Sequence, residues 1–420
     1  MHGAPTLRPI LEERSHLAID ITLIRHGETE GNAGDVWQGH GDSALTPLGR
    51  RQAADLGRRM AGRSFDRVVA SDLGRVLDTA RRAGLDPEPM KEWREVDLGR
   101  WEGLSRVSVV ERFPDEVAAL AAGEDVPLGG GERWSEFGER IDTALDALLE
   151  GAHDGDRIAV VAHGGVVHAV VAGTLGFRGR RRPWPVGPAS NTSITRLHVD
   201  DGSRTIRVFN DASHTETAAG PAEGATLGLI RHGESEGNVR GTWQGITDGA
   251  LTDRGRRQAD DLAAWYRRPT ALYASRLRRA RDTAAALGRR VGADPVIRDD
   301  VVEMSFGAWE DLTTEEIVAR DGAAFAAAFE HDHPRGGDGE TFAGVAERMR
   351  SALGEIAEGH AGETVGVVSH GGAIRAFAAT AAGLSHATRN RIAIPDNASV
   401  SHVRFGVDGP VIEDYNTPGG

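Results

Sequence analysis

Cysteine is absent from this chain of 420 residues. Disulfide bridges, thiolate metal sites and a cysteine nucleophile are therefore all excluded. Basic residues are outnumbered, with 49 Lys and Arg against 63 Asp and Glu, and the net charge of -14 argues against a general affinity for nucleic acid or for an anionic membrane. Any site for an anion must then be a local cluster of arginines.

Long hydrophobic runs are also missing. No run approaches the ~18 apolar residues of a membrane-spanning helix, and the N-terminus has no apolar core of signal-peptide length. We therefore expect a cytoplasmic protein. Hydrophobic residues make up 39% of the chain and charged residues 27%, which is typical of globular proteins, and the length suffices for two cores.

A ten-residue phrase occurs twice, as LIRHGETEGN from Leu23 and LIRHGESEGN from Leu229. Three more residues repeat downstream with nearly the same offset of 206 positions: Arg75 with Arg279, Glu95 with Glu303, and His163 with His370. Such a period indicates two whole domains in tandem. We expect a leader at 1–17, a first domain at 18–212, a small, polar, proline-containing linker at 213–225 and a second domain at 226–417.

Strand and helix patterns alternate along both domains. In the first we expect strands at 18–24, 67–70 and 157–162, helices at 47–60, 73–83, 166–175 and within 105–122 and 132–150, and a closing hairpin of 193–199 with 205–209. The second repeats this order, with strands at 227–230, 271–274 and 364–368 and a hairpin around 399–405. The alternation predicts the α/β class, as two tandem three-layer αβα domains, each a mostly parallel sheet with helices on both faces.

The tripeptide Arg25-His26-Gly27 ends the first strand, at the sheet edge where ligands bind in open α/β folds. An arginine matches the geometry of a phosphate, and an imidazole beside it can attack phosphorus. We expect the glycine to let a phosphoryl group approach the backbone. Alone, the tripeptide is equally consistent with a surface pair, but Arg231 and His232 repeat it.

Two further groups come from the segments that follow. Arg75 and Arg279 lie at expected strand-to-helix turns, where a second arginine would help to neutralise a dianionic phosphate. Arg278 competes in the second copy, although the spacing of the motif favours Arg279. Glu95 and Glu303 lie in loops with Gly and Trp four and six positions later, and such a carboxyl can protonate a leaving alkoxide.

A second histidine follows another buried strand in each copy. His163 and His370 each precede two glycines, and each ring can donate to a phosphoryl oxygen or orient the first imidazole. Glu102 and Glu310 are rival carboxylates that we consider less suited to act as the acid. Singly, each of these groups has an ordinary structural interpretation, as a solvated arginine, a salt-bridged glutamate or a core histidine.

Together the motifs make the chain resemble two fused members of the histidine phosphatase superfamily, with the phosphoglycerate mutase-like fold. The pieces that match are RHGETEGN and RHGESEGN, SDLGRVLDTA and SRLRRARDTA, REVDLGRWEG and VEMSFGAWED, GGGE and GDGE, and AHGG and SHGG. The resemblance implies that His26 and His232 become transiently phosphorylated, with Glu95 and Glu303 as general acids. It implies that the phosphate is held by His163, His370, Arg25, Asn32, Arg75, Arg231, Asn238 and Arg279.

Three positions depart from the family pattern, namely Val76, Arg276 and Asp311, and none of them removes a reactive group. Mutases of the family generally carry longer insertions after the acid, whereas only 68 positions separate Glu95 from His163. We therefore expect a metal-independent phosphatase without cofactors, acting on a small phosphorylated metabolite and partnered by neither nucleic acid nor membrane. The alternatives are a phosphoglycerate-type mutase, and one active domain with a phosphate-binding regulatory domain.

The substrate and the oligomeric state are not fixed by these motifs. Segments 105–135 and 312–340 are expected to line the mouths of the two pockets, and they differ in charge and bulk. The first domain has Arg106, Arg112 and Trp134 where the second has Thr313, Arg320 and Phe342. His331 and His333 imitate a metal-binding pair, but a charged loop is the better interpretation.

Overall fold

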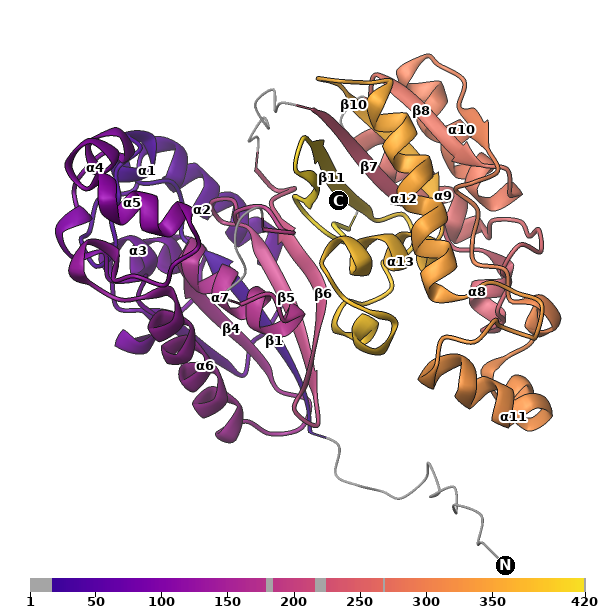
Figure 1. Cartoon of the computed structure of the whole chain (residues 1–420), viewed down its shortest axis with the longest axis horizontal. Helices are drawn as coiled ribbons and strands as arrows, with labels where there is room; N and C mark the ends of the chain where they lie inside the picture. Colours follow the sequence, from indigo (N-terminus) through magenta and orange to yellow (C-terminus); the bar gives the residue numbers. More distant parts are fainter. Residues whose placement is uncertain (1–16, 179–183, 216–223, 267–268, 419–420) are drawn as a thin grey trace, which may run out of the picture.

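The computed structural model describes residues 17–178, 184–215, 224–266 and 269–418. The predicted leader lies outside these ranges apart from Leu17, and so does most of the predicted linker, at 216–223. The described chain forms two α/β domains that lie side by side, the first from indigo to magenta and the second from pink to yellow (Figure 1).

The first domain is built around a six-stranded sheet in the order β3-β2-β4-β1-β5-β6. Strands β3, β2, β4 and β1 run parallel, and β5 and β6 run antiparallel at one edge. The strands are β1 (Ala18–Arg25), β2 (Arg67–Ser71), β3 (Glu88–Met90), β4 (Arg157–Ala162), β5 (Ile194–Asp200) and β6 (Ser203–Asp211). The helices are α1 (Glu30–Ala33), α2 (Pro47–Met60), α3 (Gly74–Arg82), α4 (Arg106–Arg112), α5 (Pro114–Ala121), α6 (Trp134–Glu150) and α7 (Gly164–Leu175).

The second domain repeats this arrangement in the order β12-β11-β7-β10-β8-β9. Its strands are β7 (Ala225–Arg231), β8 (Ala271–Ser275), β9 (Val296–Arg298), β10 (Thr364–Ser369), β11 (Val400–Gly406) and β12 (Gly409–Ile412). Its helices are α8 (Glu236–Arg240), α9 (Asp253–Trp265), α10 (Arg278–Val291), α11 (Thr314–Glu330), α12 (Phe342–Glu358) and α13 (Gly371–Ala381). Two mostly parallel sheets with helices confirm the predicted fold class.

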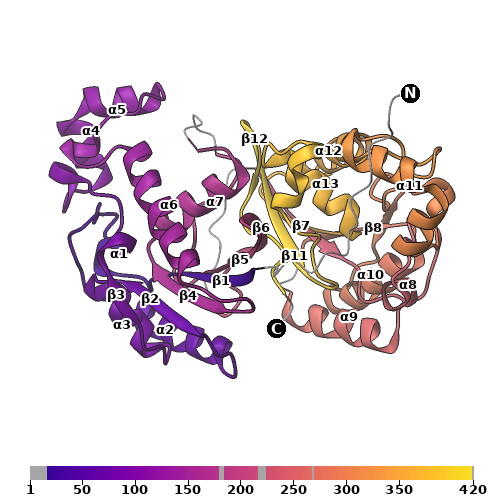
Figure 2. The same cartoon turned by 90° about the horizontal axis from the view of Figure 1, so that it is seen from below.

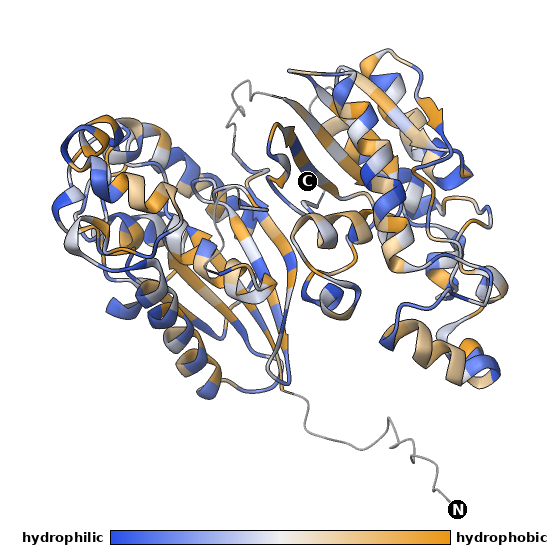
Figure 3. Ribbon diagram, viewed as in Figure 1, coloured by the Kyte–Doolittle hydropathy of each residue, from blue (hydrophilic) through white to orange (hydrophobic). Residues whose placement is uncertain are grey.

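Hydrophobic strands lie at the centre of each domain. In β1, Ile19, Ile21, Leu23 and Ile24 are all at most 1% exposed, so both faces of the strand are covered, as expected for a parallel sheet between helix layers. Figure 3 shows the same pattern, with orange strands inside and blue on the outer helices. Among the described residues, no helix has the length and apolar character needed to cross a bilayer.

Two helix boundaries differ from expectation. The helix that follows His163 begins at Gly164, not at residue 166, because two glycines hid its first turn from the pattern. The 105–122 region forms two helices, α4 and α5, that are separated at Phe113 because Pro114 starts a new helix at its first position. The early start of α7 places its first backbone N–H groups directly beside His163.

The domains join along the edge where β6 ends. The backbones of Phe209 and Tyr415 exchange two hydrogen bonds across this boundary, at 3.0 and 2.9 Å. A single hydrophobic cluster contains Ile206 and Phe209 from the first domain together with Ile392 and Tyr415 from the second. In Figure 2, β6 of the first domain accordingly lies next to β11 and β12 of the second.

Candidate active sites

The two histidines of each domain meet at the carboxyl edge of the sheet. His26 directly follows β1 and His163 directly follows β4, and these two strands are parallel neighbours. Their ring centroids lie 5.3 Å apart, and those of His232 and His370 lie 5.1 Å apart. The rings are buried, with exposed fractions of 3% or less. The repeat has thus built the same pair twice.

The first histidine of each pair is held in one tautomer. Nδ1 of His26 lies 2.8 Å from the carbonyl oxygen of Gly27, and Nδ1 of His232 lies 2.7 Å from that of Gly233. Because a carbonyl oxygen only accepts, Nδ1 carries the proton and Nε2 keeps its lone pair. Burial and the neighbouring arginines hold the pKa of His26 well below its ordinary value of 6.5, so the ring stays neutral.

The second histidine is bonded to a serine of the adjacent strand. Nε2 of His163 lies 2.8 Å from Oγ of Ser71, and Nε2 of His370 lies 2.8 Å from Oγ of Ser275. Burial, then the nearby arginine, lowers the pKa of both rings well below the ordinary value. Nη2 of Arg75 can only donate and lies 3.3 Å from Nδ1 of His163, so this Nδ1 accepts and Nε2 donates to Ser71. Nδ1 of His370 has no partner among the described residues; when Ser275 donates to Nε2, this Nδ1 carries the proton and can offer it to a bound oxyanion.

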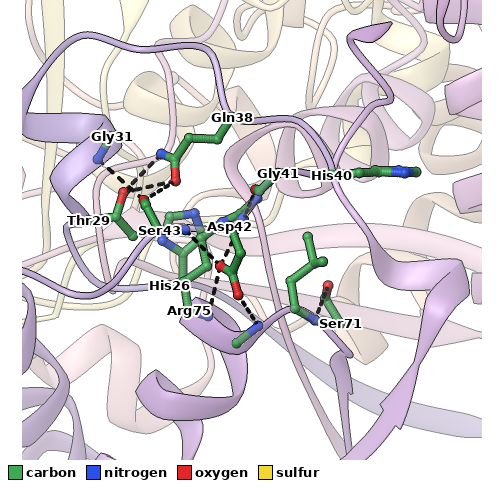
Figure 4. A network of polar contacts seen from close by, with 12 residues as sticks. His26, Thr29, Gly31, Gln38, His40, Gly41, Asp42, Ser43, Ser71 and Arg75 are labelled. Carbon is green, nitrogen blue, oxygen red and sulfur yellow. Dashed lines mark hydrogen bonds and ion pairs between the residues drawn. The ribbon is translucent and has the colours of Figure 1, made fainter. Parts of the chain in front are cut away.

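A buried arginine from the start of a helix joins each pair. Arg75 is 2% exposed and donates to the carbonyls of Gly39 at 2.8 Å and Gly41 at 2.6 Å. The carboxylate of Asp42 lies 3.2 Å from Arg75 (Figure 4). Nη2 of Arg75 also lies 3.3 Å from Nδ1 of His163. The structure therefore places Arg75 next to the histidines, and its role toward a phosphate stays a prediction.

Arg279 takes the equivalent place in the second domain. It is 1% exposed, and its Nε donates to Nε2 of His232 at 3.3 Å. The competing Arg278 lies instead on the exposed face of α10, beside Asp282. The structure thus places Arg279, and not Arg278, next to His232.

Several buried donors at the sites have no hydrogen-bond partner within the described protein. They are Nε of Arg25, Arg75 and Arg231, with Nδ1 of His370. A buried polar atom without a partner is costly, and such atoms are rare unless a ligand or water completes them. Donors around a ring nitrogen with a lone pair fit an anion that offers several acceptor oxygens.

The predicted acid of each domain lies against the first turn of a helix. Oε2 of Glu95 accepts from the backbone N–H of Gly165 at 3.0 Å, and Oε2 of Glu303 accepts from Gly372 at 2.9 Å. A Cβ on Gly165 would lie 2.1 Å from Oε1 of Glu95, so only glycine leaves room for the carboxyl. The salt bridge considered as an alternative is not formed, because Arg94 pairs with Asp72.

An arginine that the motifs did not single out fixes the loop of each acid. Arg140 donates to the carbonyls of Arg94 and Glu95 at 3.1 Å each, and it pairs with Glu132 at 2.7 Å. Arg348 repeats these contacts in the second domain. The signal that could have revealed them is that both arginines stand eight positions after the glutamate of the GGGE and GDGE pieces.

Glu102 and Glu310, the alternative candidates for the acid, stabilise a loop of the site. Oε1 and Oε2 of Glu102 accept from the backbone N–H groups of His40 at 2.7 Å and Gly41 at 2.9 Å, and Glu310 holds the equivalent loop. These bonds shape the loop whose carbonyls receive Arg75. Figure 4 shows the same loop from Gln38 to Ser43 beside His26.

Asn32 and Asn238 cap the short helices that follow the first histidines. Oδ1 of Asn32 accepts from the backbone of Thr29 at 3.2 Å and from Nδ2 of Asn191 at 3.3 Å. Oδ1 of Asn238 receives the equivalent bonds. Because Oδ1 is used within the protein, the amide Nδ2 is the group through which either residue would contact a phosphate.

Gly27 has a packing role that the motif did not reveal. A Cβ at this position would lie 2.7 Å from the carbonyl oxygen of Gly49, and one at Gly233 would lie 2.4 Å from that of Gly255. The glycine is therefore required by close packing against the start of α2 in the first domain and of α9 in the second. That Gly27 also lets a phosphoryl group approach the backbone stays a prediction.

One departure from the family pattern and three of the residues expected at the pocket mouths have local explanations. Asp311 has a left-handed backbone with φ of 60°, which Asp tolerates better than most residues. Arg106 pairs with Asp35 at 2.6 Å, and Arg320 with Asp321 at 2.9 Å. Thr313 caps α11. The role of these residues toward a substrate stays a prediction.

Most of the chain matches one protein family, in two consecutive copies. The model of the histidine phosphatase superfamily (branch 1) matches residues 21–212 and again residues 227–418. The chain belongs to the histidine phosphatase superfamily. Because the two matches take in nearly all of both domains, the tandem fusion predicted from the repeat is confirmed.

Three curated relatives are each similar to about one domain. Phosphoglycerate mutase-like protein 4 of Arabidopsis thaliana is 34% identical, over 47% of this chain and 87% of the relative. Glucosyl-3-phosphoglycerate phosphatase of Mycolicibacterium vanbaalenii is 35% identical, over 42% and 83%. The metal-independent phosphoserine phosphatase of Arabidopsis thaliana is 34% identical, over 42% and 76%.

Proposed function

We propose that both domains hydrolyse phosphate monoesters of small metabolites through a phosphohistidine intermediate, without a metal ion or another cofactor. The observation that carries the proposal is the set of buried arginine and histidine donors without partners around Nε2 of His26 and of His232. A phosphoryl group supplies the acceptor oxygens that these donors lack. Two of the relatives named above are phosphatases, which supports hydrolysis.

The first step transfers the phosphoryl group to the enzyme. Nε2 of His26 attacks phosphorus while the bond between phosphorus and the alcohol oxygen breaks, and Glu95 gives its proton to that oxygen. The alcohol therefore leaves as a neutral molecule. Arg25 and Arg75 donate to the non-bridging oxygens and balance their charge in a site from which water is largely excluded.

The second step returns the enzyme to its starting state. Water attacks phosphorus as the bond to Nε2 of His26 breaks, and the Glu95 carboxylate accepts a proton from that water. Inorganic phosphate leaves, and the imidazole is again neutral. The proton on Nδ1 stays bonded to the Gly27 carbonyl throughout, so the ring keeps its orientation. The second domain follows the same steps with His232 and Glu303.

Separate removal of the two nucleophiles tests the proposal. With p-nitrophenyl phosphate as substrate, we expect each single variant, His26→Ala or His232→Ala, to retain the phosphate release of the unchanged domain. The double variant should release no phosphate. His331→Ala, which changes an exposed histidine of the second domain, serves as the control. If one single substitution abolishes all turnover, the other domain is the regulatory module considered above.

The mutase alternative is favoured by the mutase-like relative. It predicts isomer formation from 3-phosphoglycerate without free phosphate. Hydrolysis predicts free phosphate, and the two products are readily separated by ³¹P NMR. A panel of phosphorylated metabolites, assayed in the His26→Ala and His232→Ala backgrounds, then assigns a substrate class to each domain.

A further inference from the structure

Residues that face each other across the domain boundary are related by the offset of the repeat. Phe209 and Tyr415 stand 206 positions apart, as His26 and His232 do, and they pair with each other. In a two-fold dimer, equivalent residues meet in this way on the symmetry axis. The boundary therefore has the form of an isologous interface within a single chain.

Two asparagines next to this pair reach into the opposite domain. Nδ2 of Asn210 donates to the carbonyl of Glu413 at 2.7 Å, and Nδ2 of Asn416 donates to the carbonyl of Arg207 at 2.8 Å. Both asparagines are buried, with exposed fractions of 7% and 2%. Both have a φ of 56°, in the left-handed region that asparagine tolerates. The two bonds are equivalent under the repeat.

The other end of each amide holds a loop of its own domain. Oδ1 of Asn210 accepts from the backbone N–H of Ser190 at 2.7 Å, and Oδ1 of Asn416 accepts from that of Asp396 at 2.6 Å. We name residues 188–193 and 394–399 the anchor loops. Each anchor loop is thus fastened, through one amide group, to the backbone of the opposite domain.

The first anchor loop directly contacts the site. The carbonyl of Ala189 accepts from Nη1 of Arg25 at 2.6 Å. Nδ2 of Asn191 donates to the carbonyl of His26 at 3.0 Å and to Oδ1 of Asn32 at 3.3 Å. The loop therefore positions the arginine, the nucleophile and the capping asparagine together.

The second anchor loop makes the same contacts. The carbonyl of Pro395 accepts from Nη1 of Arg231 at 2.6 Å. Nδ2 of Asn397 donates to the carbonyl of His232 at 3.0 Å and to Oδ1 of Asn238 at 3.0 Å. Because the anchor loops make these contacts in both copies, we consider the contacts part of the site.

Both anchor loops contain a backbone conformation that needs external support. Thr192 has a φ of 58° and Ala398 a φ of 57°. The left-handed region is unfavourable for alanine and more so for a β-branched residue, so it persists only where the surroundings impose it. The backbone N–H groups of Thr192 and Ala398 bond to the carbonyls of the first histidines, which ties this conformation to the site.

We infer that Asn210 and Asn416 are positioning residues, and that each makes the phosphate site of its own domain depend on contact with the opposite domain. The inference rests on the proposed function for the role of the sites. Without the bond from the asparagine across the boundary, each anchor loop keeps a tie to the opposite domain only just before its first residue, where Gly187 donates to the carbonyl of Ile412 and Ala393 to that of Ile206. Arg25 or Arg231 then has more freedom, and phosphate binding weakens before the chemistry itself is lost.

The substitution Asn210→Asp removes the donor nitrogen of the amide and keeps its acceptor oxygen. Aspartate can still accept from Ser190, but a carboxylate oxygen replaces the donor that lies 2.7 Å from the carbonyl of Glu413 and 3.3 Å from that of Pro188, and this oxygen repels both carbonyls. In the His232→Ala background, where all turnover comes from the first domain, we expect KM to rise about tenfold, which is the effect of losing one hydrogen bond, and kcat to change less. Amide hydrogen exchange of residues 188–193 should also become faster.

Two controls belong to this experiment. In the His26→Ala background, Asn210→Asp should leave the KM of the second domain within about twofold, because its own anchor loop keeps Asn416. Arg207→Ala removes an exposed side chain three positions away on β6 and leaves the backbone carbonyl in place. It should change neither KM nor exchange.

The outcomes are distinct. If Asn210→Asp leaves both KM and the exchange of residues 188–193 unchanged, the bond within the domain suffices and the inference is wrong. Equal increases of KM in both domains would indicate general loosening and would also contradict it. If neither background releases phosphate, the proposed function fails, while the exchange rates still decide whether the anchor crosses the boundary.

Discussion

Replacement of Gly372 by alanine is expected to disable the acid of the second domain and to leave its phosphate site intact. An added Cβ would lie 2.6 Å from Oε1 of Glu303, whereas ordinary contacts begin near 3.4 Å. The carboxyl of Glu303 must therefore move away from residue 372 by the difference between these two distances. That movement breaks the hydrogen bonds that it accepts from the backbone of Gly372 at 2.9 Å and Ala373 at 2.8 Å.

The size of the effect follows from this displacement. A misplacement of about 1 Å costs about 10²-fold in rate, or about 2.7 kcal/mol of barrier. In the His26→Ala background, kcat for an alkyl phosphate should fall by this factor while KM stays near its parent value. With p-nitrophenyl phosphate the loss should be much smaller, because the phenolate leaves without needing a proton from Glu303.

The matched control is Gly354→Ala in α12, where an added Cβ has no atom within 4 Å. It repeats the chemical change in the same domain and should leave kcat unchanged, with a gain of about 1 kcal/mol in the free energy of unfolding. The reasoning is refuted if Gly372→Ala retains full kcat on the alkyl phosphate. It is refuted equally if both substrates lose the same factor, since Glu303 would then not be the acid.

Three further predictions concern the first domain. The unfolded chain takes up protons on His26 and His163 below pH 6.5, whereas burial keeps the folded rings neutral. The free energy of unfolding should therefore fall with falling pH in that range, by up to about 1.4 kcal/mol per pH unit for each ring. Urea titrations at pH 7.5 and 5.5 check this, and His163→Gln should reduce the slope. Arg140→Met releases the Glu95 loop, so in the His232→Ala background it should lower kcat more for an alkyl phosphate than for p-nitrophenyl phosphate. Equal losses of kcat on the two substrates would contradict the role of Arg140 in holding this loop. Ser71→Ala should raise KM by about tenfold or less with the fold intact by circular dichroism, since one hydrogen bond to His163 is lost.

Much of the fold was predictable because its signals are local. Thr46 followed by Pro47 marks a helix start, and α2 begins at Pro47, as expected, with Thr46 accepting from the backbone of Gly49. The apolar run of β1 likewise needs no tertiary information. Repetition of each motif in the second copy added a check that a single domain would not have offered.

Contacts between distant residues were not predictable in the same way. Arg140 and Asn191 resemble ordinary surface residues in the sequence, and only the folded chain brings them to the acid loop and to His26. The close approach of Gly27 to Gly49 was not predictable for the same reason, since it is set by the packing of α2. Spacing identifies residue types at a site, whereas the groups that orient them depend on tertiary packing.

The pairing of Phe209 with Tyr415 shows what the fusion permits. In a homodimer every substitution occurs twice, so a residue on the symmetry axis always meets its own copy. Here the two members of the pair are encoded separately, and they have diverged: the hydroxyl that only Tyr415 possesses donates to the carbonyl of Ala393 at 2.5 Å. Such one-sided changes give each half of the gene a freedom to specialise that an unlinked ancestor lacks.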